Sequence, residues 1–434
     1  MKDRIYLMRD WFFTEEFTED MIVDTMDVSL AQTVSLPHTC KETPYHYFDE
    51  HTYQMVSCYQ KILYAPEGWQ GKRLLLTFEA VGHEAEVYVN GKKMAEHHCG
   101  YTAFTIDISE ALNYGADNLL TVRVDSNETL DQPPFGFVID YMTYGGIYRD
   151  VYLEVKNSIY IEDIFLKPKF AETVTTKGMD AKAIAQMQVS GILASEVTYS
   201  VKAQEAISAG QVGIRQIVDD QVVLEAPIAT TSFSTPVADV MLWDIESPKV
   251  YEVTTQLLYQ GQVVDEKRVT VGFREALFRK DGFYLNGRKV RIRGLNRHQS
   301  YAYVGYAMPE SMQRLDAKIL KEELAVNAVR TSHYPQSHYF MDACDRLGLL
   351  VFTEMPGWQH IGGQAWQDQA VENIKDMIVQ YRNHPSIILW GVRINESQDN
   401  DAFYERTNAT AHALDDTRQT GGVRAMKKSH LLED

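Results

Sequence analysis

The sequence predicts a multidomain protein in which β structure is followed by an α/β region. At about 150 residues per domain, the 434 residues correspond to roughly three domains. Short runs of alternating apolar and polar residues, separated by turn signals, fill the chain up to Arg274, and strand and helix patterns alternate after it. Apolar residues make up 45% of the chain and charged residues 24%, which excludes a disordered, collagen-like or coiled-coil protein.

Charge and cysteine content exclude several classes of partner and site. Lys and Arg number 42 against 60 Asp and Glu, a net charge of -18 that disfavours nucleic-acid and membrane partners. The 4 cysteines form no CxxC pair, so the signature of a zinc ribbon or a thioredoxin-like site is missing. Charges among the first ten residues argue against a signal peptide, and no apolar run approaches the roughly 20 residues of a membrane span. We therefore expect a cytoplasmic protein.

The first β block is expected to be a sandwich or jelly roll. The Asn90-Gly91 turn between alternating runs is a strong hairpin signal, because both residues tolerate a positive φ. Several short strands with such turns are typical of these folds. The clearest predicted strands are Arg73–Phe78, Ala85–Val89 and Leu119–Val124.

The second β block has the length of one immunoglobulin-like sandwich. Its predicted strands include Glu196–Val201 and Tyr251–Leu258, and Lys177–Asp180 is expected to form a hairpin tip or loop.

The remaining residues are expected to form successive strand–helix units. A helix opening at Pro309 should bury an apolar face that includes Leu315 and Leu324. The strand Ser386–Trp390 is almost wholly apolar, as in parallel sheets that are covered on both faces. Four such units indicate the front half of a (β/α)₈ barrel or a doubly wound sheet.

Polar side chains follow each predicted strand of this region. The carboxyl ends of parallel strands share one edge, so these groups are expected to meet there. HExxH, GxSxG and GxGxxG motifs are absent from the sequence, which leaves carboxylate chemistry with polar positioning groups, as in sugar hydrolysis. Trp358, Trp366 and Tyr334 could offer flat faces to a sugar ring, with core packing as an equal alternative. The four clusters are Asn296-Arg297-His298, Arg330-Thr331-Ser332-His333-Tyr334-Pro335, Glu354-Met355-Pro356-Gly357-Trp358 and Arg393-Ile394-Asn395-Glu396-Ser397.

Two stretches of the chain resemble motifs of glycoside hydrolase family 2, which contains β-galactosidases, β-glucuronidases and β-mannosidases. Arg382-Asn383-His384-Pro385-Ser386, followed by Trp390 and Asn395-Glu396, is similar to the family signature, and Tyr144–Val151 resembles its sugar-binding domain. The resemblance implies three domains. These are a jelly-roll sugar-binding domain over residues 1–157, an immunoglobulin-like β-sandwich over 158–274 and the N-terminal part of a TIM-barrel catalytic domain over 275–434.

The resemblance also implies roles for individual residues. Glu396 matches the general acid/base, which we expect to be partly buried. Asn395 and His333 would bind sugar hydroxyls, Arg330 would orient a carboxylate, and Asp140 would reach a distal hydroxyl from the first domain. The other expected substrate contacts are Asn296, His298, Glu354 and Trp358.

The implied activity is that of a retaining exo-β-glycosidase acting on a β-linked carbohydrate. Arg297-His298 is closer to the galactosidase form, so we expect a β-galactosidase, with β-glucuronidase as the alternative. No cofactor is expected, and no metal ligand set can be assigned, although some family members use ions near the site. A homo-oligomer is expected for the full-length form.

The family's nucleophilic glutamate lies on a later barrel strand than those read here. We therefore expect the 434 residues to be a fragment that lacks the nucleophile and is inactive alone. The competing interpretation is a non-catalytic carbohydrate-binding protein.

Overall fold

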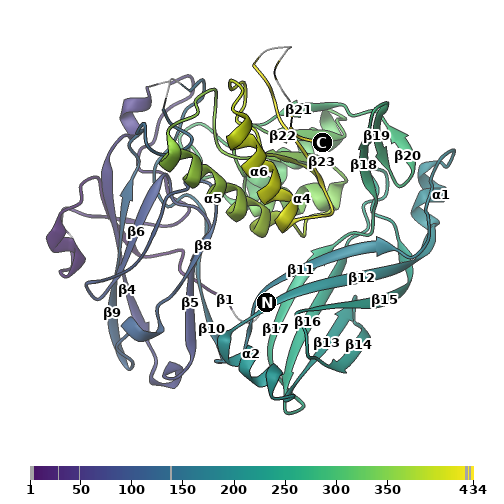
Figure 1. Ribbon diagram of the computed structural model, residues 1–434. Coiled ribbons are helices and arrows are strands. Elements are labelled where there is room, and N and C mark those ends of the chain that lie inside the picture. Colours follow the sequence, from purple (N-terminus) through teal and green to yellow (C-terminus); the bar gives the residue numbers. More distant parts are fainter. Residues whose placement is uncertain (1–3, 28, 48, 137–138, 426–428, 430–431) are drawn as a thin grey trace.

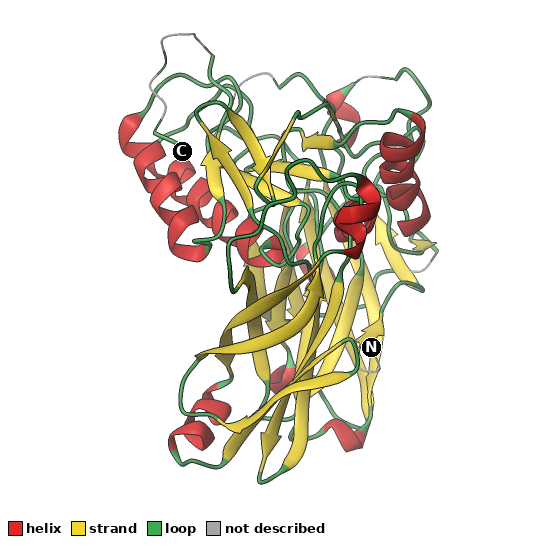
Figure 2. Cartoon of the chain, turned by 90° about the vertical axis from the view of Figure 1, so that its right-hand side faces the viewer, coloured by secondary structure: helices red, strands yellow, loops and turns green. Residues whose placement is uncertain are grey.

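The computed structural model describes residues 4–27, 29–47, 49–136, 139–425, 429 and 432–434, and it has three parts (Figure 1). Two β domains lie beside and below an α/β domain whose long helices gather in the upper part of Figure 2. Among the described residues, no helix combines the length and the apolar character that crossing a membrane requires.

The first part packs two antiparallel sheets around Trp11, Tyr59, Leu76 and Val122, all fully buried. The expected hairpin is confirmed, because Asn90 and Gly91 adopt φ of 49° and 82° between β6 (Glu84–Val89) and β7 (Lys92–His97). One sheet has the order β1 (Arg4–Tyr6), β10 (Val151–Lys156), β5 (Arg73–Phe78), β8 (Phe104–Asp107). The other has the order β3 (Gln32–Val34), β2 (Trp11–Thr14), β4 (Val56–Ala65), β9 (Ala116–Asp125), β6 (Glu84–Val89), β7 (Lys92–His97). Short 3₁₀ turns cover Glu19–Ile22, Glu50–Tyr53, Glu67–Trp69 and Ser109–Ala111.

The second part is also a two-sheet sandwich. One sheet consists of β11 (Ile161–Phe170), β12 (Gln188–Tyr199) and β15 (Ser232–Met241). The other has the order β14 (Gln221–Pro227), β13 (Val212–Val218), β16 (Tyr251–Tyr259), β17 (Gln262–Val271).

Two short helices of this sandwich were not predicted. Val201 was expected in a strand, but it opens α2 (Val201–Ser208), because the Ser200 hydroxyl caps the helix by accepting from the Ala203 amide. Lys177–Asp180, expected to be a hairpin tip or loop, is a loop, and it leads into α1 (Ala181–Gln186), which is capped by Asp180.

The third part contains the predicted parallel sheet, preceded by a small antiparallel one. The small sheet is β18 (Ala276–Arg279), β19 (Gly282–Leu285) and β20 (Arg288–Val290). The parallel sheet runs β21 (Gly294–Asn296), β22 (Ala328–Thr331), β23 (Leu350–Glu354), β24 (Ile387–Gly391), β25 (Gln419–Gly421). Its helices are α3 (Glu310–Lys318), extended by a π-helical turn at Ile319–Glu323, then α4 (His338–Leu347), α5 (Gln364–Tyr381) and α6 (Asp401–Leu414).

The predicted buried face of α3 is wrong in part. Leu315 and Leu324 are 51% and 53% exposed, whereas Gln313, Ala317 and Leu320 are buried. The helix is rotated because Gln313 accepts a 2.9 Å hydrogen bond from the buried guanidinium of Arg297.

A tyrosine cluster joins the first part to the parallel-sheet domain. Tyr101 stacks on Tyr334 at 4.4 Å between ring centroids, and Tyr306 lies 5.3 Å from Tyr148. Arg149 crosses the same interface by donating to Gln299 and to the Pro335 carbonyl, each at 3.0 Å. This contact fixes the loop around residue 140 over the carboxyl ends of the strands.

Candidate functional site

The core of the site is a hydrogen-bonded network centred on Arg330 at the end of β22. Arg330 Nη2 donates to Glu354 Oε1 and to Asn395 Oδ1, at 2.7 Å in each case. His333 Nδ1 lies 2.8 Å from the same Glu354 oxygen. Glu354 is only 1% exposed, so its charge depends on these partners. The structure thus joins side chains that follow three neighbouring strands, as the sequence predicted.

Glu396 is the next residue after Asn395, at the edge of this network. Its backbone amide donates to the Val423 carbonyl at 2.8 Å, and the Gln359 amide donates to the Asn395 carbonyl at 2.7 Å. Gln359 and Glu396 both adopt a left-handed backbone, with φ of 58° and 54°. Such conformations are costly for residues other than glycine and concentrate at functional sites.

The expectation that Glu396 is partly buried is wrong. The residue is exposed, and its carboxylate accepts one long hydrogen bond, 3.4 Å, from Gln359 Nε2. The backbone bonds around Glu396 restrain the loop but do not cover the side chain, which leaves the carboxylate open to a ligand.

Arg393 anchors the loop that carries Glu396. Arg393 is 1% exposed, donates to Asp399 at 2.7 Å and to the Ser397 carbonyl at 3.3 Å, and lies over the Tyr404 ring. Arg393 therefore acts on the shape of the loop rather than on a ligand.

The first part contributes Asp140 and Tyr141. Asp140 is exposed, and buried Tyr141 packs 5.0 Å from His298 and 5.8 Å from His333 between ring centroids. Burial lowers the pKa of His298 to about 4, helped by the charge of His333 and opposed by Asp140. His298 is thus neutral near pH 7, and its Nδ1 lies 3.0 Å from the Tyr334 hydroxyl.

Two aromatic candidates are wrong as sugar-binding faces. Tyr334 is 0% exposed and Trp366 is 2% exposed, because one packs in the tyrosine cluster and the other donates its indole N–H to the Phe135 carbonyl at 2.9 Å. Trp358 is half-buried and pairs with Asn395 in an isolated bridge, which leaves it at the site.

Asn296 and its neighbour Arg297 differ in exposure and in side-chain pairing. Asn296 is exposed and in register with Arg330, although its side chain has no hydrogen bond among the described residues. Arg297 is buried and forms an ion pair with Asp316 at 2.6 Å, so its side chain does not reach the network.

The Arg382–Ser386 motif lies at the other end of β24 and serves a structural purpose. Arg382 forms an ion pair with Asp163 at 2.5 Å. The Asn383 side chain accepts from the Leu166 amide and donates to the Ile164 carbonyl, both at 2.9 Å. These residues hold β11 of the second part against the parallel-sheet domain.

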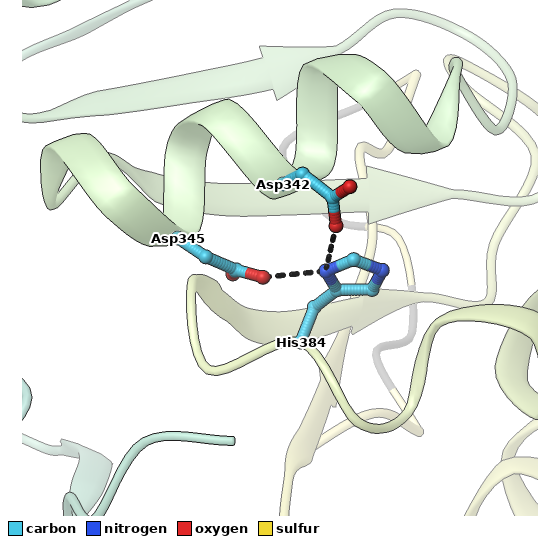
Figure 3. A group of neighbouring side chains, drawn as sticks. All are labelled: Asp342, Asp345 and His384. Atoms are coloured by element: carbon cyan, nitrogen blue, oxygen red, sulfur yellow. Dashed lines mark hydrogen bonds and ion pairs between the residues drawn. The ribbon is translucent and has the colours of Figure 1, made fainter. Parts of the chain in front are cut away.

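One group in the described part of the chain has the composition of a metal site: Asp342, Asp345 and His384 (Figure 3). His384 Nδ1 lies 2.6 Å from Asp345, whose second oxygen accepts from the Ser386 amide at 3.0 Å. Burial acts to lower the pKa of His384, but the charge and hydrogen bond of Asp345 outweigh it and raise the pKa. A protonated imidazole has no lone pair for a metal, so the geometry fits an internal ion pair.

Comparison with known proteins places these features in a family. Three sequence models of one family match in order along the chain. They are the family 2 glycosyl hydrolase sugar binding domain at residues 27–157, the family 2 glycosyl hydrolase model at 159–274 and the family 2 TIM barrel domain at 277–430. The chain belongs to glycosyl hydrolase family 2.

Individual relatives of this family 2 chain include enzymes with two sugar specificities. A β-galactosidase of Thermoanaerobacterium thermosulfurigenes is 44% identical over 100% of this chain and 60% of its own length. A β-glucuronidase of Bacteroides fragilis is 31% identical over 96% and 60%. The solved structure of a β-glycosidase from Bacteroides vulgatus is 26% identical with a TM-score of 0.83, over 97% of this chain and 54% of that one. The chain thus spans about 60% of the length of the two curated relatives.

Sequence reasoning missed two residues of the site, Gln359 and Tyr141. Each follows a predicted residue, Trp358 or Asp140, and that adjacency was the available signal. Neither residue type by itself indicates a role, because Gln359 reaches Glu396 through a loop pairing and Tyr141 reaches His298 across a domain interface.

Proposed function

We propose that this protein is a retaining exo-β-glycosidase that prefers β-galactosides. Glu396 protonates the glycosidic oxygen as the leaving group departs, and then takes a proton from the attacking water. The observation that carries this proposal is the Arg330 network, which places Asn395 and the exposed Glu396 at the carboxyl ends of the parallel strands.

The other side chains are assigned to substrate binding and orientation. His333 commits Nδ1 to Glu354, so we assign its Nε2 to a sugar hydroxyl, together with the Asn395 amide nitrogen. Asp140, His298, Asn296 and Trp358 are assigned to further contacts with the substrate. A retaining reaction needs a second carboxylate about 5 Å from the first. Glu354 is held by Arg330 and His333, and we assign no nucleophile among these 434 residues.

The preference for galactose rests on the relatives. The β-galactosidases of Thermoanaerobacterium thermosulfurigenes and Thermoanaerobacter pseudethanolicus are 44% and 42% identical, against 31% for the Bacteroides fragilis β-glucuronidase. A panel of nitrophenyl glycosides, tested on the protein expressed from its complete coding region, should give the highest kcat/KM for the β-galactoside. A higher value for the β-glucuronide would contradict the sugar assignment. Binding without turnover would support the non-catalytic alternative.

The role of Glu396 is tested by Glu396→Gln. We expect kcat on a β-galactoside with a poor leaving group to fall by about 10²–10⁴-fold, because proton transfer is lost. An activated dinitrophenyl leaving group needs little protonation, so the loss on that substrate should be smaller. Glu405→Gln, an exposed position on α6, is the control. Equal losses on the two substrates would contradict the acid/base role.

A further inference from the structure

A polar cavity lies at the opposite ends of the strands from Glu396. It has a volume of about 400 Å³ and is bounded by residues 288–293, by Lys321 in the π-helical turn, by Asn327 and by the Ile245-Glu246 loop. Residues 293 and 327 directly precede β21 and β22, whereas the Arg330 network follows the carboxyl ends. The two sites are therefore separate.

The lining of this cavity is strongly cationic. The chain as a whole carries more acidic than basic residues, with a net charge of -18. In this lining, Glu246 is the only acidic residue. The basic residues are Arg288, Lys289, Arg291, Arg293 and Lys321.

Two of these cations, Arg291 and Arg293, have no acidic partner among the described residues. Arg288 pairs with Asp244 at 2.9 Å and Lys289 pairs with Asp281 at 3.1 Å. Lys321 interacts with the charges of Glu246 and Asp244, whereas neither Arg291 nor Arg293 forms an ion pair within the described part of the chain. Like charges gathered without counter-charges repel one another, so the cavity attracts an anion.

Hydrogen bonds with neutral groups hold the Lys321 side chain and the backbone of Arg291 and Arg293 in place. Lys321 Nζ donates to the Ile245 and Gly348 carbonyls at 2.8 and 3.0 Å. The Asn327 side chain accepts from the Arg293 amide at 2.8 Å and donates to the Arg291 carbonyl at 2.9 Å. These bonds fix the backbone that carries both arginines, which lowers the entropy cost of binding a ligand.

We propose that this cavity binds a phosphate group, either as inorganic phosphate or on a small phosphorylated metabolite. A doubly charged phosphate matches the unpaired cations better than a carboxylate, and its oxygens fit guanidinium forks. The volume leaves room for an organic group attached to the phosphate.

The test is calorimetric titration, with phosphate at constant ionic strength, of the protein expressed from its complete coding region, using the Arg291→Gln/Arg293→Gln double variant for comparison. Both arginines are exposed, so the double variant should fold. We expect saturable binding to the wild type, and a Kd about 10-fold or more higher in the double variant. Arg9→Gln, an exposed cation of the first part, should bind as the wild type does.

Absence of saturable binding to the wild type would overturn the proposal, as would an unchanged Kd in the double variant. Titration with glucose 6-phosphate identifies the source of the phosphate. Tighter binding than that of inorganic phosphate indicates a phosphorylated metabolite, and weaker binding indicates inorganic phosphate itself. This readout is independent of any glycosidase activity.

Discussion

The two ends of β24 carry polar clusters of similar composition that are used differently. At the amino end, Asn383, His384 and Asp345 bond to backbone groups and to each other, and Arg382 pairs with Asp163. At the carboxyl end, the Arg330 network is also tightly bonded, but Glu396 beside it is exposed. Residue composition alone therefore does not distinguish a functional site from a structural cluster. The distinguishing feature is whether a reactive group is left accessible at the edge of a fixed network.

Among the variants that compare the two ends, Arg330→Lys at the carboxyl end should have the greatest effect. Lysine keeps the charge but cannot bridge Glu354 and Asn395 as a guanidinium fork does. We expect kcat/KM to fall by about 100-fold, as for small displacements of catalytic groups, and the free energy of unfolding to fall by about 2 kcal/mol. Enzyme assays and urea unfolding measure the two quantities. Arg346→Lys, exposed on α4, serves as the control, and an unchanged kcat/KM would show that the network does not position the site.

At the amino end, Asn383→Ala should affect stability alone. It removes two hydrogen bonds to β11, worth about 1 kcal/mol each. Urea unfolding should show a loss of about 2 kcal/mol, while kcat/KM of the folded protein stays unchanged. Exposed Asn113→Ala should leave both quantities as they are. A fall in kcat/KM at a temperature where the variant is fully folded would place this motif in the catalytic machinery.

The pKa values of the histidines at the two ends should be shifted in opposite directions. Burial lowers the pKa of His298 to about 4, so below pH 6.5 the unfolded chain binds a proton that the folded one does not, and stability falls towards pH 4. Asp345 raises the pKa of His384 against the effect of burial, so its contribution is fully present below pH 6.5 and is lost as the pH rises through the raised value. NMR titration, assigned with His298→Gln and His384→Gln, should give the lower pKa for His298. The reverse order would remove the electrostatic contrast between the two ends.

The smallest effect is expected from Gln359→Ala. The hydrogen bond to Glu396 is long, so its loss should lower kcat/KM on a poor leaving group by about 2–10-fold. Gln364→Ala, at the exposed start of α5, is the matched control. A loss as large as that of Glu396→Gln would mean that Gln359 itself contacts the reacting atoms.

Sequence patterns alone predict the order of the β and α/β parts, the Asn90-Gly91 hairpin, the parallel strands and the meeting of Arg330, His333, Glu354 and Asn395. These follow from local periodicity and from the rule that parallel strands present their carboxyl ends at one edge. The tertiary structure determines which polar groups are buried or hydrogen-bonded within the protein, and sequence patterns do not. It buried Tyr334 and Trp366, rotated α3 towards Arg297, tied Asn383 to β11 and left Glu396 exposed. The physical reason is that exposure and hydrogen-bond pairing depend on contacts between segments far apart in the chain, which no local pattern encodes.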